Sequence, residues 1–554
     1  TYFLIFFRKY VFIGKDMKKE VKKILSLCFS IMVLTLTNSC NQVNNSNDAS
    51  LTSFESVNYE NINTIKDINT YQGEVKKDSK NNDDPVENGV INCPYYTLSV
   101  NGKDVNVYST RCAMSVHSFA WIDVLNSKDI KLDVSLKLKN KHKNVVVLPL
   151  SSKVEATIND DEVKATITSL GSFSFAFDKK VNEGLTIYVS LKEELKNENN
   201  YNVSTFEPNS YTIAQTDFKD TNTVYYFKKG TYTISSINLP SNSILYFESG
   251  CYFNVVGETP KDAYAGIRST GTENINIYGR AIFDFSKNQG GDATVKGVFN
   301  FMNVSNVRFS GITVINSNSW SVCFTNSDNV LVEKIMIFGY RTYSDGIMLS
   351  DCQDSVVRNC FVRTGDDAIE AKSTGSEESK NLLYENNAVW TDKARAYGCI
   401  YESNKNMDNI VFRNNSVGFA LATWTDRLGC LSVAMGTRRT TVWQNIHFED
   451  IEIYMAYHAL MNITLADDIS NGTDGGTAKN IYFKNINAYR AYGLALRINV
   501  LKGSTLGKVY LDNIKYNEKE LEEKNLDNKD EVNITHYDAS WSKKLNIKVN
   551  TLTD

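Results

Sequence analysis

Two stretches of the sequence, NVRFSGITV at 306–314 and NVLVEKIMI at 329–337, share one pattern that decides the fold. Each begins with Asn and carries apolar side chains one, three, six and eight positions later. An amphipathic helix buries every third or fourth residue and does not produce this spacing. Alternation that is interrupted once by a turn is typical of two short β-strands joined at a corner.

The same frame returns along the second half of the chain. It starts at Asn306, Asn329, Asp354, Asn381, Asn409, Asn445, Asn480 and Lys508, at spacings of 23, 25, 27, 28, 36, 35 and 28 residues. A repeat of this length indicates a solenoid whose coils stack about 4.8 Å apart, so that equal positions form ladders. Blades of a β-propeller run to about 40 residues. We therefore predict a parallel β-helix over 206–554, in which Asn387 and Asn415 form a buried hydrogen-bonded pair.

The residues before the repeat have a different pattern. Between 93 and 205 the chain alternates apolar and polar residues in short runs, such as LDVSLKL at 132–138, which predicts a β-sandwich. Cys93 and Cys112 are candidates for a disulfide at the start of this domain. Residues 40–92 are polar without an apolar period, which predicts a disordered linker. The expected fold class is all-β, a parallel β-helix preceded by an N-terminal β-sandwich.

Residues 1–39 are expected to be upstream residues and a lipoprotein-type signal peptide. Lysines follow Met17, an apolar run covers 24–36, and small residues precede Cys40. This order resembles bacterial lipoprotein signals, in which the cysteine is lipidated. A retained membrane anchor is the alternative. We expect an exported lipoprotein at the cell surface or in the periplasm, or otherwise a secreted protein.

Charge and composition exclude several classes of function. The 554-residue chain is 42% hydrophobic and 22% charged, with an apolar run only at its N-terminus, so a multi-span membrane protein is excluded. Residues 1–39 hold seven Lys or Arg against two acids, and their removal lowers the net charge from −4 to −9. An acidic exported protein is a poor partner for nucleic acid. The cysteines form no CxxC pair, and no metal site or cofactor is expected.

Three aspartates fall in equivalent loops of neighbouring coils. Asp345 precedes Gly346-Ile347, and Asp366-Asp367 precede Ala368-Ile369. Alignment of the two isoleucines stacks Asp345 and Asp367 in one column about 4.8 Å apart, with Asp366 beside them. Carboxylates this close raise the pKa of at least one member. The arrangement suits two bases that hold one water molecule and a third carboxyl that acts as an acid, which is the chemistry of glycoside hydrolysis.

Two other interpretations of these acidic loops stay open. Asp-Gly and Gly-Asp-Asp are common turn sequences, and acids clustered between coils also bind Ca²⁺. The column itself is expected to continue from Trp320, below Asp345, to Tyr397, above Asp367.

Ser344-Asp345-Gly346 and Gly365-Asp366-Asp367 resemble the Asn-Thr-Asp and Gly-Asp-Asp motifs of glycoside hydrolase family 28, the polygalacturonases. They are similar as well to the three aspartates of family 49, the dextranases and isopullulanases, and the order of sandwich and β-helix is closer to that family. The resemblance implies a right-handed β-helix and an inverting enzyme without a cofactor. It also implies that Asp366 is the general acid and that Asp345 and Asp367 activate the water molecule.

Residues around these aspartates are candidates for binding the substrate. Aromatic rings stack on sugar faces, and cationic side chains donate to hydroxyls or to an anionic group. The candidates are Trp320, Tyr343, Lys393, Arg395, Tyr397, Trp424 and Arg427. Each of them has an ordinary structural alternative, as a packing or a solvated residue. Glu402 is a weaker candidate, and Lys372 is expected to be a strand residue.

The sequence thus predicts an extracellular glycoside hydrolase that cleaves a polysaccharide or oligosaccharide and meets a membrane only through an N-terminal lipid anchor. One alternative is a polysaccharide lyase of the same fold, which needs Ca²⁺ and a Lys or Arg base and releases products that absorb in the ultraviolet. The other is a non-catalytic glycan-binding or adhesive β-helix, in which Asp366→Asn changes nothing.

Overall fold

A computed structural model gives the fold for most of the chain. It describes residues 51–63, 89–196, 200–208, 211–257, 266–288, 290, 297–424, 428–436, 441–465 and 475–551. The predicted signal peptide and Cys40 lie outside these residues. Residues 51–554 cluster as one compact unit. No helix within the described ranges is long and apolar enough to cross a membrane.

The N-terminal strands form two sheets that face each other. Within the described residues, one sheet has the order β2-β5-β6-β12-β11-β8, with β1 paired to β6, and the other has the order β4-β3-β7-β10-β9. Apolar side chains from both sheets fill the space between them, as expected for a sandwich. The strands are β1 Phe54–Ser56, β2 Val90–Asn92, β3 Tyr96–Val100, β4 Lys103–Val105, β5 Tyr108–Arg111, β6 Val116–Val124, β7 Leu132–Leu138, β8 Val145–Leu148, β9 Ala156–Asn159, β10 Glu162–Ile167, β11 Gly171–Phe177 and β12 Gly184–Leu191, with a 3₁₀ turn at Leu150–Ser152.

Two expectations for the N-terminal part are corrected. Phe54–Ser56, within the predicted linker, pairs antiparallel with β6, because Val57 and Tyr59 beside it are apolar enough to be buried. Cys93 and Cys112 are both free thiols, so they form no disulfide.

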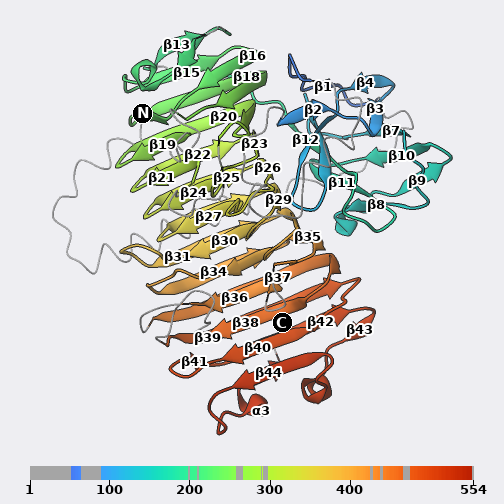
Figure 1. The fold of residues 1–554 in the computed structure, drawn as a ribbon, viewed down its shortest axis with the longest axis vertical. Coiled ribbons are helices and arrows are strands. Elements are labelled where there is room, and N and C mark those ends of the chain that lie inside the picture. The colour runs from blue at the N-terminus through green and yellow to red at the C-terminus, as the bar shows by residue number, and fades with distance from the viewer. Residues whose placement is uncertain are drawn as a thin grey trace. The chain divides into compact units, whose positions relative to one another are not determined.

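The remaining strands wind into a parallel β-helix (Figure 1). The first of them begins at Asn202, slightly before the predicted boundary, and already pairs parallel with the next coil. The strands of the first coils are β13 Asn202–Phe206, β14 Thr212–Ile213, β15 Thr223–Phe227, β16 Gly230–Ile234, β17 Ile237–Asn238, β18 Ser243–Val255, β19 Ile267–Thr270, β20 Glu273–Asp284 and β21 Phe299–Met302, with a 3₁₀ turn at Gln215–Asp217.

The middle coils each contribute three strands, and these coils carry the candidate site. They are β22 Ser305–Ser310, β23 Ile312–Ile315, β24 Val322–Thr325, β25 Asp328–Glu333, β26 Met336–Phe338, β27 Ile347–Ser350, β28 Gln353–Arg358, β29 Phe361–Thr364, β30 Ile369–Lys372, β31 Ser379–Glu385, β32 Ala388–Thr391, β33 Tyr397–Cys399, β34 Met407–Arg413, β35 Ser416–Ala420 and β36 Gly429–Met435.

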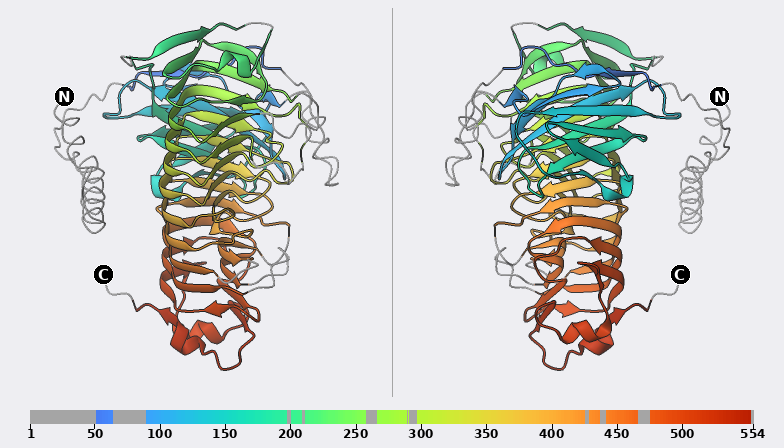
Figure 2. Two further views of the ribbon diagram at one scale, coloured as in Figure 1. Left: turned by 90° about the vertical axis from the view of Figure 1, so that its left-hand side faces the viewer. Right: turned by 90° about the vertical axis from the view of Figure 1, so that its right-hand side faces the viewer.

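The last coils fuse the first two strands into one. They comprise β37 Val442–Ala456, β38 Ala459–Leu465, β39 Thr477–Ala488, β40 Leu496–Val500, β41 Thr505–Leu506, β42 Val509–Tyr516, β43 Lys519–Glu520, β44 Val532–His536 and β45 Ile547–Val549, with a 3₁₀ turn at Glu523–Asp527 and a short helix α3 at Lys543–Asn546. Figure 2 shows the coils stacked on one another along the β-helix.

The registers explain the repeating frame of the sequence. Phe309 pairs with Val332, and Tyr384 with Phe412 in later coils, so the third position of the frame forms a ladder inside the solenoid. The rings of Tyr384 and Phe412 stack with centroids 4.6 Å apart. The amide of Asn387 donates to the side-chain oxygen of Asn415, which confirms the predicted buried pair. The predicted all-β class, with a β-sandwich before a parallel β-helix, is confirmed.

The sandwich packs against the middle strands of the β-helix. The indole Nε1 of Trp121 donates to Thr313 Oγ1, and the buried guanidinium of Arg280 donates to Asp123 Oδ1. Aromatic side chains of both parts form a shared core between them. The loops at one end of the sandwich thereby come to lie beside the loops that precede β30 and β33.

Candidate active site

Three aspartates meet where two loops enter strands of the same sheet. Asp345 lies just before β27, and Asp366 and Asp367 lie just before β30. Ile347 pairs with Ile369, and the Gly346 N–H donates to the Asp367 carbonyl at 2.9 Å. The predicted stacking of Asp345 and Asp367 in one column is thus confirmed.

We call Asp345, Asp366 and Asp367 the aspartate cluster. One carboxylate oxygen from each lies within 4.8 Å of those of the other two. Asp345 and Asp367 are buried, whereas Asp366 is partly exposed. Asp366 Oδ1 accepts a hydrogen bond from the Asp367 N–H, which fixes the two neighbours relative to each other. Three carboxylates at this separation can hold either one water molecule or one divalent cation.

The electrostatics of the aspartate cluster favour partial protonation. Burial, and then the charge of Asp367, raise the pKa of Asp366 to about 6. Burial, followed by the charges of Asp366 and Glu370, raises the pKa of the Asp345 carboxyl well above its usual range. Its Oδ1 has no hydrogen-bond partner within the described residues. Carboxyls whose proton affinity is raised at neutral pH are suited to acid–base chemistry.

Arg395, predicted to bind substrate, is buried and contacts Asp367 of the cluster. Its backbone N–H donates to Asp367 Oδ1 at 2.8 Å, and its Nη1 donates to Asp367 Oδ2 at 2.9 Å. The side chain is 1% exposed, and its guanidinium lies 4.5 Å from the ring centroid of Tyr401. Arg395 therefore orients a carboxylate. Its contact with substrate stays a prediction, since its Nε and Nη2 have no hydrogen-bond partner within the described residues.

Tyr397, also predicted to bind substrate, lies in the interior of the solenoid. It pairs with Ile369, so the column of Asp345 and Asp367 continues to Arg395 and not to Tyr397. Tyr397 is fully buried in the core, and its hydroxyl donates to the carbonyl of Asn387. The substrate cannot reach it there. Alignment of Tyr397-Gly398 with Asp345-Gly346 places the column two residues too far along, because the loop before β33 is only one residue longer than the loop before β30.

A further charged group beside the cluster includes Glu370, which was not predicted from the sequence, together with Lys372 and Glu402. In β30, Glu370 and Lys372 occupy alternate positions with their side chains outside the solenoid core. Lys372 Nζ lies 3.4 Å from Glu370, 2.9 Å from Glu402 and 4.7 Å from the ring centroid of Trp320. Burial raises the pKa of Glu370 to about 8. The sequence does carry a signal for this group: both outward-facing positions of the strand that follows Asp366-Asp367 are charged.

The other predicted binding residues are spread around the cluster. Tyr343 is 38% exposed in the Asp345 loop, with a left-handed backbone φ of 59° that is rare for an aromatic residue. Lys393 is partly exposed in the loop of Arg395, and its carbonyl accepts from the N–H of Trp424, whose side chain is 55% exposed. Arg427 lies outside the described residues.

The sandwich contributes to the surroundings of the site. Arg363, at the end of β29, is fully buried and pairs with Asp392 at 3.1 Å. Its guanidinium also donates to Ser115 Oγ and to the carbonyl of Val181, both at loop tips of the sandwich. The N–H of Met114 donates to Asp392 Oδ2 at 3.0 Å. These contacts hold the sandwich tips one coil beyond the aspartate cluster.

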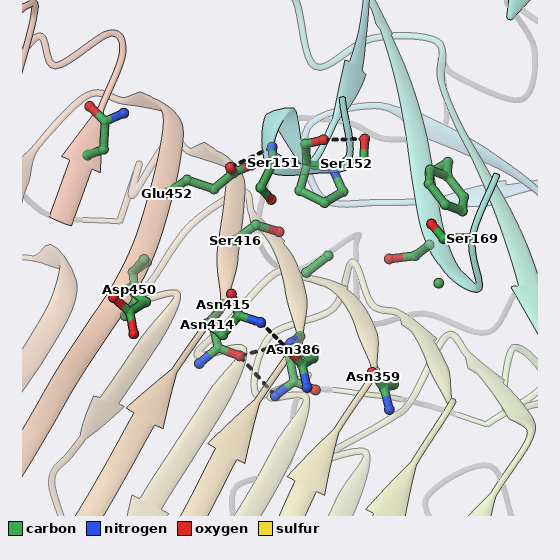
Figure 3. A pocket seen from close by; sticks show the side chains of 18 of the residues that line it. Ser151, Ser152, Ser169, Asn359, Asn386, Asn414, Asn415, Ser416, Asp450 and Glu452 are labelled. Atoms are coloured by element: carbon green, nitrogen blue, oxygen red, sulfur yellow. Dashed lines mark hydrogen bonds between the residues drawn. The ribbon is translucent and has the colours of Figure 1, made fainter. Parts of the chain in front are cut away.

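A groove of about 590 Å³ lies between the sandwich and the β-helix, away from the aspartate cluster (Figure 3). Asn386 and Asn414 follow each other there in successive coils and are joined by a side-chain hydrogen bond. Glu452 accepts hydrogen bonds from the backbone N–H groups of Leu150 and Ser151. These polar groups already hold one another and the sandwich, so the aspartate cluster is the better candidate for chemistry.

The sequence model of a family described as "Glycosyl hydrolases family 28" matches residues 230–533, which is more than half of the chain and includes the whole aspartate cluster. The chain belongs to glycosyl hydrolases family 28. This confirms the resemblance stated from the two aspartate motifs and places the chain among the glycoside hydrolases.

Individual members of the family 28 clan are distant from this chain. A "Probable polygalacturonase" of Vitis vinifera is 24% identical over 189 residues, which span 33% of this chain and only 30% of that protein. Dex49A from Penicillium minioluteum is 13% identical, with a TM-score of 0.61 over 86% of this chain and 96% of its own. A hyperthermoactive exopolygalacturonase from Thermotoga maritima is 16% identical, with a TM-score of 0.38 over 58% of this chain and 95% of its own. The likeness to Dex49A is one of fold.

Proposed function

We propose that the protein hydrolyses glycosidic bonds of a polysaccharide at the aspartate cluster. The observation that carries the proposal is that three carboxylate oxygens from adjacent coils lie within 4.8 Å of one another. The match to the family 28 model over the same residues supports it. Such a concentration of like charge is costly for folding. It is useful where protons and a water molecule must be handled together.

In the proposed reaction, each residue has one role. Asp366 is the most exposed member of the cluster and donates its proton to the oxygen of the leaving sugar. Asp345 and Asp367 hold the attacking water molecule, and the ionised member of the pair accepts its proton as the carbon–oxygen bond forms. Arg395 keeps Asp367 in place during this step. Electrons and protons balance without a cofactor.

The stereochemical outcome is part of the proposal. Direct attack by water inverts the anomeric centre, and acid and base in inverting enzymes usually stand about 6.5–9.5 Å apart. A separation near 5 Å is found where one carboxylate attacks the sugar itself with net retention. Proton NMR of the first product distinguishes the two: inversion supports the water-holding pair, and retention assigns the nucleophile to one aspartate instead.

The substrate is proposed as a glycan of the dextran, pullulan or polygalacturonate type. The full chain is incubated with each polymer, and new reducing ends are compared with those from Asp366→Asn. Loss of the general acid is expected to lower the rate about 10³-fold. Asp354→Asn is the matched control, because Asp354 is an exposed residue that lies outside the cluster and shares its backbone conformation with the asparagines of equivalent positions. Products that absorb in the ultraviolet point to a lyase, and hydrolysis that survives Asp366→Asn overturns the proposal.

We also propose that the protein acts outside the cell, anchored by a lipid on Cys40. The support is the order of lysines, apolar run and small residues from Met17 to Cys40. Cells that are fed a labelled fatty acid are expected to label the wild-type protein and not the Cys40→Ser variant. Equal labelling of both overturns the anchor.

A further inference from the structure

We infer that a pocket beside Tyr457 binds a distal segment of the same polysaccharide chain that is cleaved at the aspartate cluster. This inference rests on the proposed function. It adds a second region where the polysaccharide contacts the protein, and the sandwich forms part of that region. It identifies Tyr457, Tyr492 and the sandwich tips as determinants of chain length preference.

The pocket has a volume of about 510 Å³ and two different walls. Met114 and the segment 179–182 come from loop tips of the sandwich. The β-helix supplies the opposite wall, which is formed by Phe419, Leu421, Thr423, Met455, Tyr457 and His458. A cavity with an apolar base and polar groups at its edge is the usual form of a site for a small ligand or for part of a larger one.

One exposed aromatic side chain, Tyr457, lines this pocket, and two others lie next to residues of its wall. Tyr457 is 46% exposed and Tyr492, in the next coil, is 62% exposed, with their ring centroids 5.0 Å apart. Trp424 is 55% exposed in the loop that also places Thr423 in the pocket wall. Single exposed apolar residues are ordinary, but a cluster of large rings beside a cavity marks an interaction site. Planar rings with a polar edge suit the apolar faces and hydroxyl rims of sugars.

On the β-helix side, the pocket is lined in part by loops equivalent to those that carry the aspartate cluster, further along the solenoid. Leu421 lies in the coil after Asp392, and the Tyr457 N–H donates to the carbonyl of Ala420, one coil further on. Counting coils, Tyr457 lies three beyond Asp367, or about 14 Å along the axis. A glycan bound at the aspartate cluster therefore reaches Tyr457 only if it is several sugar units long.

The sandwich tips give the pocket its polar component. Lys179 and Lys180 are exposed in the turn between β11 and β12, and both line the pocket. Their ammonium groups are donors for sugar oxygens. The same turn carries Val181, whose carbonyl accepts a hydrogen bond from Arg363, so this wall is fixed to the coil that carries Asp366 and Asp367. The occupant that fits this combination is a glycan chain and not an apolar peptide.

Binding is tested apart from catalysis by electrophoresis of the full chain through gels that contain dextran, pullulan or polygalacturonate. The Asp366→Asn variant is expected to be retarded in one of them. When Tyr457→Ala and Tyr492→Ala are introduced into the Asp366→Asn variant, binding to that polymer is expected to weaken about tenfold, because two stacking rings are lost. Tyr537→Ala is the control, because that ring is 50% exposed at the far end of the β-helix.

Hydrolysis provides the second measurement. Here both enzymes keep Asp366. The ratio of kcat/KM for the polymer to kcat/KM for a trisaccharide (isomaltotriose, panose or trigalacturonate) is expected to be about tenfold lower in the double tyrosine variant than in the wild-type enzyme. Retardation that the double variant leaves unchanged, or no retardation of its parent in any gel, overturns the inference. Hydrolysis that Asp366→Asn leaves intact overturns the proposed function instead, so the two failures are distinguishable.

Discussion

At the scale of single side chains, Arg395 is a cation that stabilises the aspartate cluster through direct contact with Asp367. It donates to Asp367 through both its backbone and its guanidinium, and it packs on the ring of Tyr401. Burial of the charge is offset by this close pairing. A buried guanidinium that contacts a reacting carboxylate positions that carboxylate.

Replacement of Arg395 by Gln is expected to lower kcat about 100-fold with little change in KM. The reason is that Asp367 loses the guanidinium that orients it, and misplacement of a reacting group by about 1 Å costs that much. Steady-state kinetics on the cleaved polymer measure both constants. Arg395→Lys keeps the charge and loses the planar pair of donors, so its kcat is expected to lie between those of the wild-type enzyme and Arg395→Gln. A rise in KM alone contradicts the positioning role.

The pH dependence of activity is expected to follow Asp366. Its pKa is raised to about 6 by burial and by the neighbouring charge of Asp367. A general acid must carry its proton, so kcat/KM is expected to fall about tenfold per pH unit above pH 6. The profile is measured from pH 4 to pH 8. A rate that stays constant up to pH 8 argues against Asp366 as the acid.

The same raised pKa has a consequence for stability. The folded pKa of about 6 lies above the ordinary value of 3.8, so the contribution of Asp366 to folding is fully present below pH 4 and is lost as the pH rises through 6. Asp366→Asn is therefore expected to stabilise the protein by about 1–2 kcal/mol at pH 7. Thermal unfolding at a fixed scan rate should show a higher Tm for the variant at pH 7 and an unchanged Tm at pH 4. An equal shift at both pH values would assign the effect to packing.

At the scale of the elements, the asparagine that opens each frame has two tasks. Asn381, the third residue of β31, adopts a left-handed φ of 54°, a conformation that asparagine tolerates better than other L-residues. Its amide donates to Asp354 in the coil before and accepts from Asn409 in the coil after. Repetition of this residue through the frames thus reflects both backbone conformation and a ladder of side-chain hydrogen bonds.

Asn381→Ala is expected to destabilise the protein by about 2 kcal/mol, since it loses the ladder and strains the backbone. Asn381→Gly relieves the strain but not the lost hydrogen bonds, so its loss is expected to be about half as large. Comparison of Tm between the two variants separates the contributions. If glycine is as destabilising as alanine, backbone strain plays no part.

At the scale of the whole molecule, a buried ion pair links the sandwich to the β-helix. Arg280 in β20 and Asp123 in β6 are both about 2% exposed, with Nη2 and Oδ1 2.7 Å apart, and Trp121 packs on the guanidinium at 4.7 Å. Asp123→Asn leaves the buried cation with a neutral partner, which is expected to cost about 3 kcal/mol. Because the pair spans both parts, calorimetry should show one transition shifted to lower temperature.

Glu162→Gln is the control for that experiment, because Glu162 pairs with Lys164 on the sandwich surface, where an ion pair contributes little. A second, unshifted transition in Asp123→Asn would mean that the sandwich and the β-helix unfold independently and that contacts at their interface do not couple their unfolding.

The sequence by itself determined the class of fold, the ladder positions and the pairing of Asp345 with Asp367. Each of these depends on a local pattern that repeats, and stacking of parallel coils converts equal positions in the frame into neighbours in space. The two aspartate motifs were therefore readable without coordinates.

Only the tertiary structure decided what surrounds those aspartates. The loop before β33 has its own length, so the frame could not show that Arg395, and not Tyr397, stands over Asp367. The contact of Met114 with Asp392 joins residues 278 positions apart in two different architectures. Such contacts follow from how the sandwich packs on the solenoid, which depends on the complementarity of whole surfaces and leaves no periodic trace in the sequence.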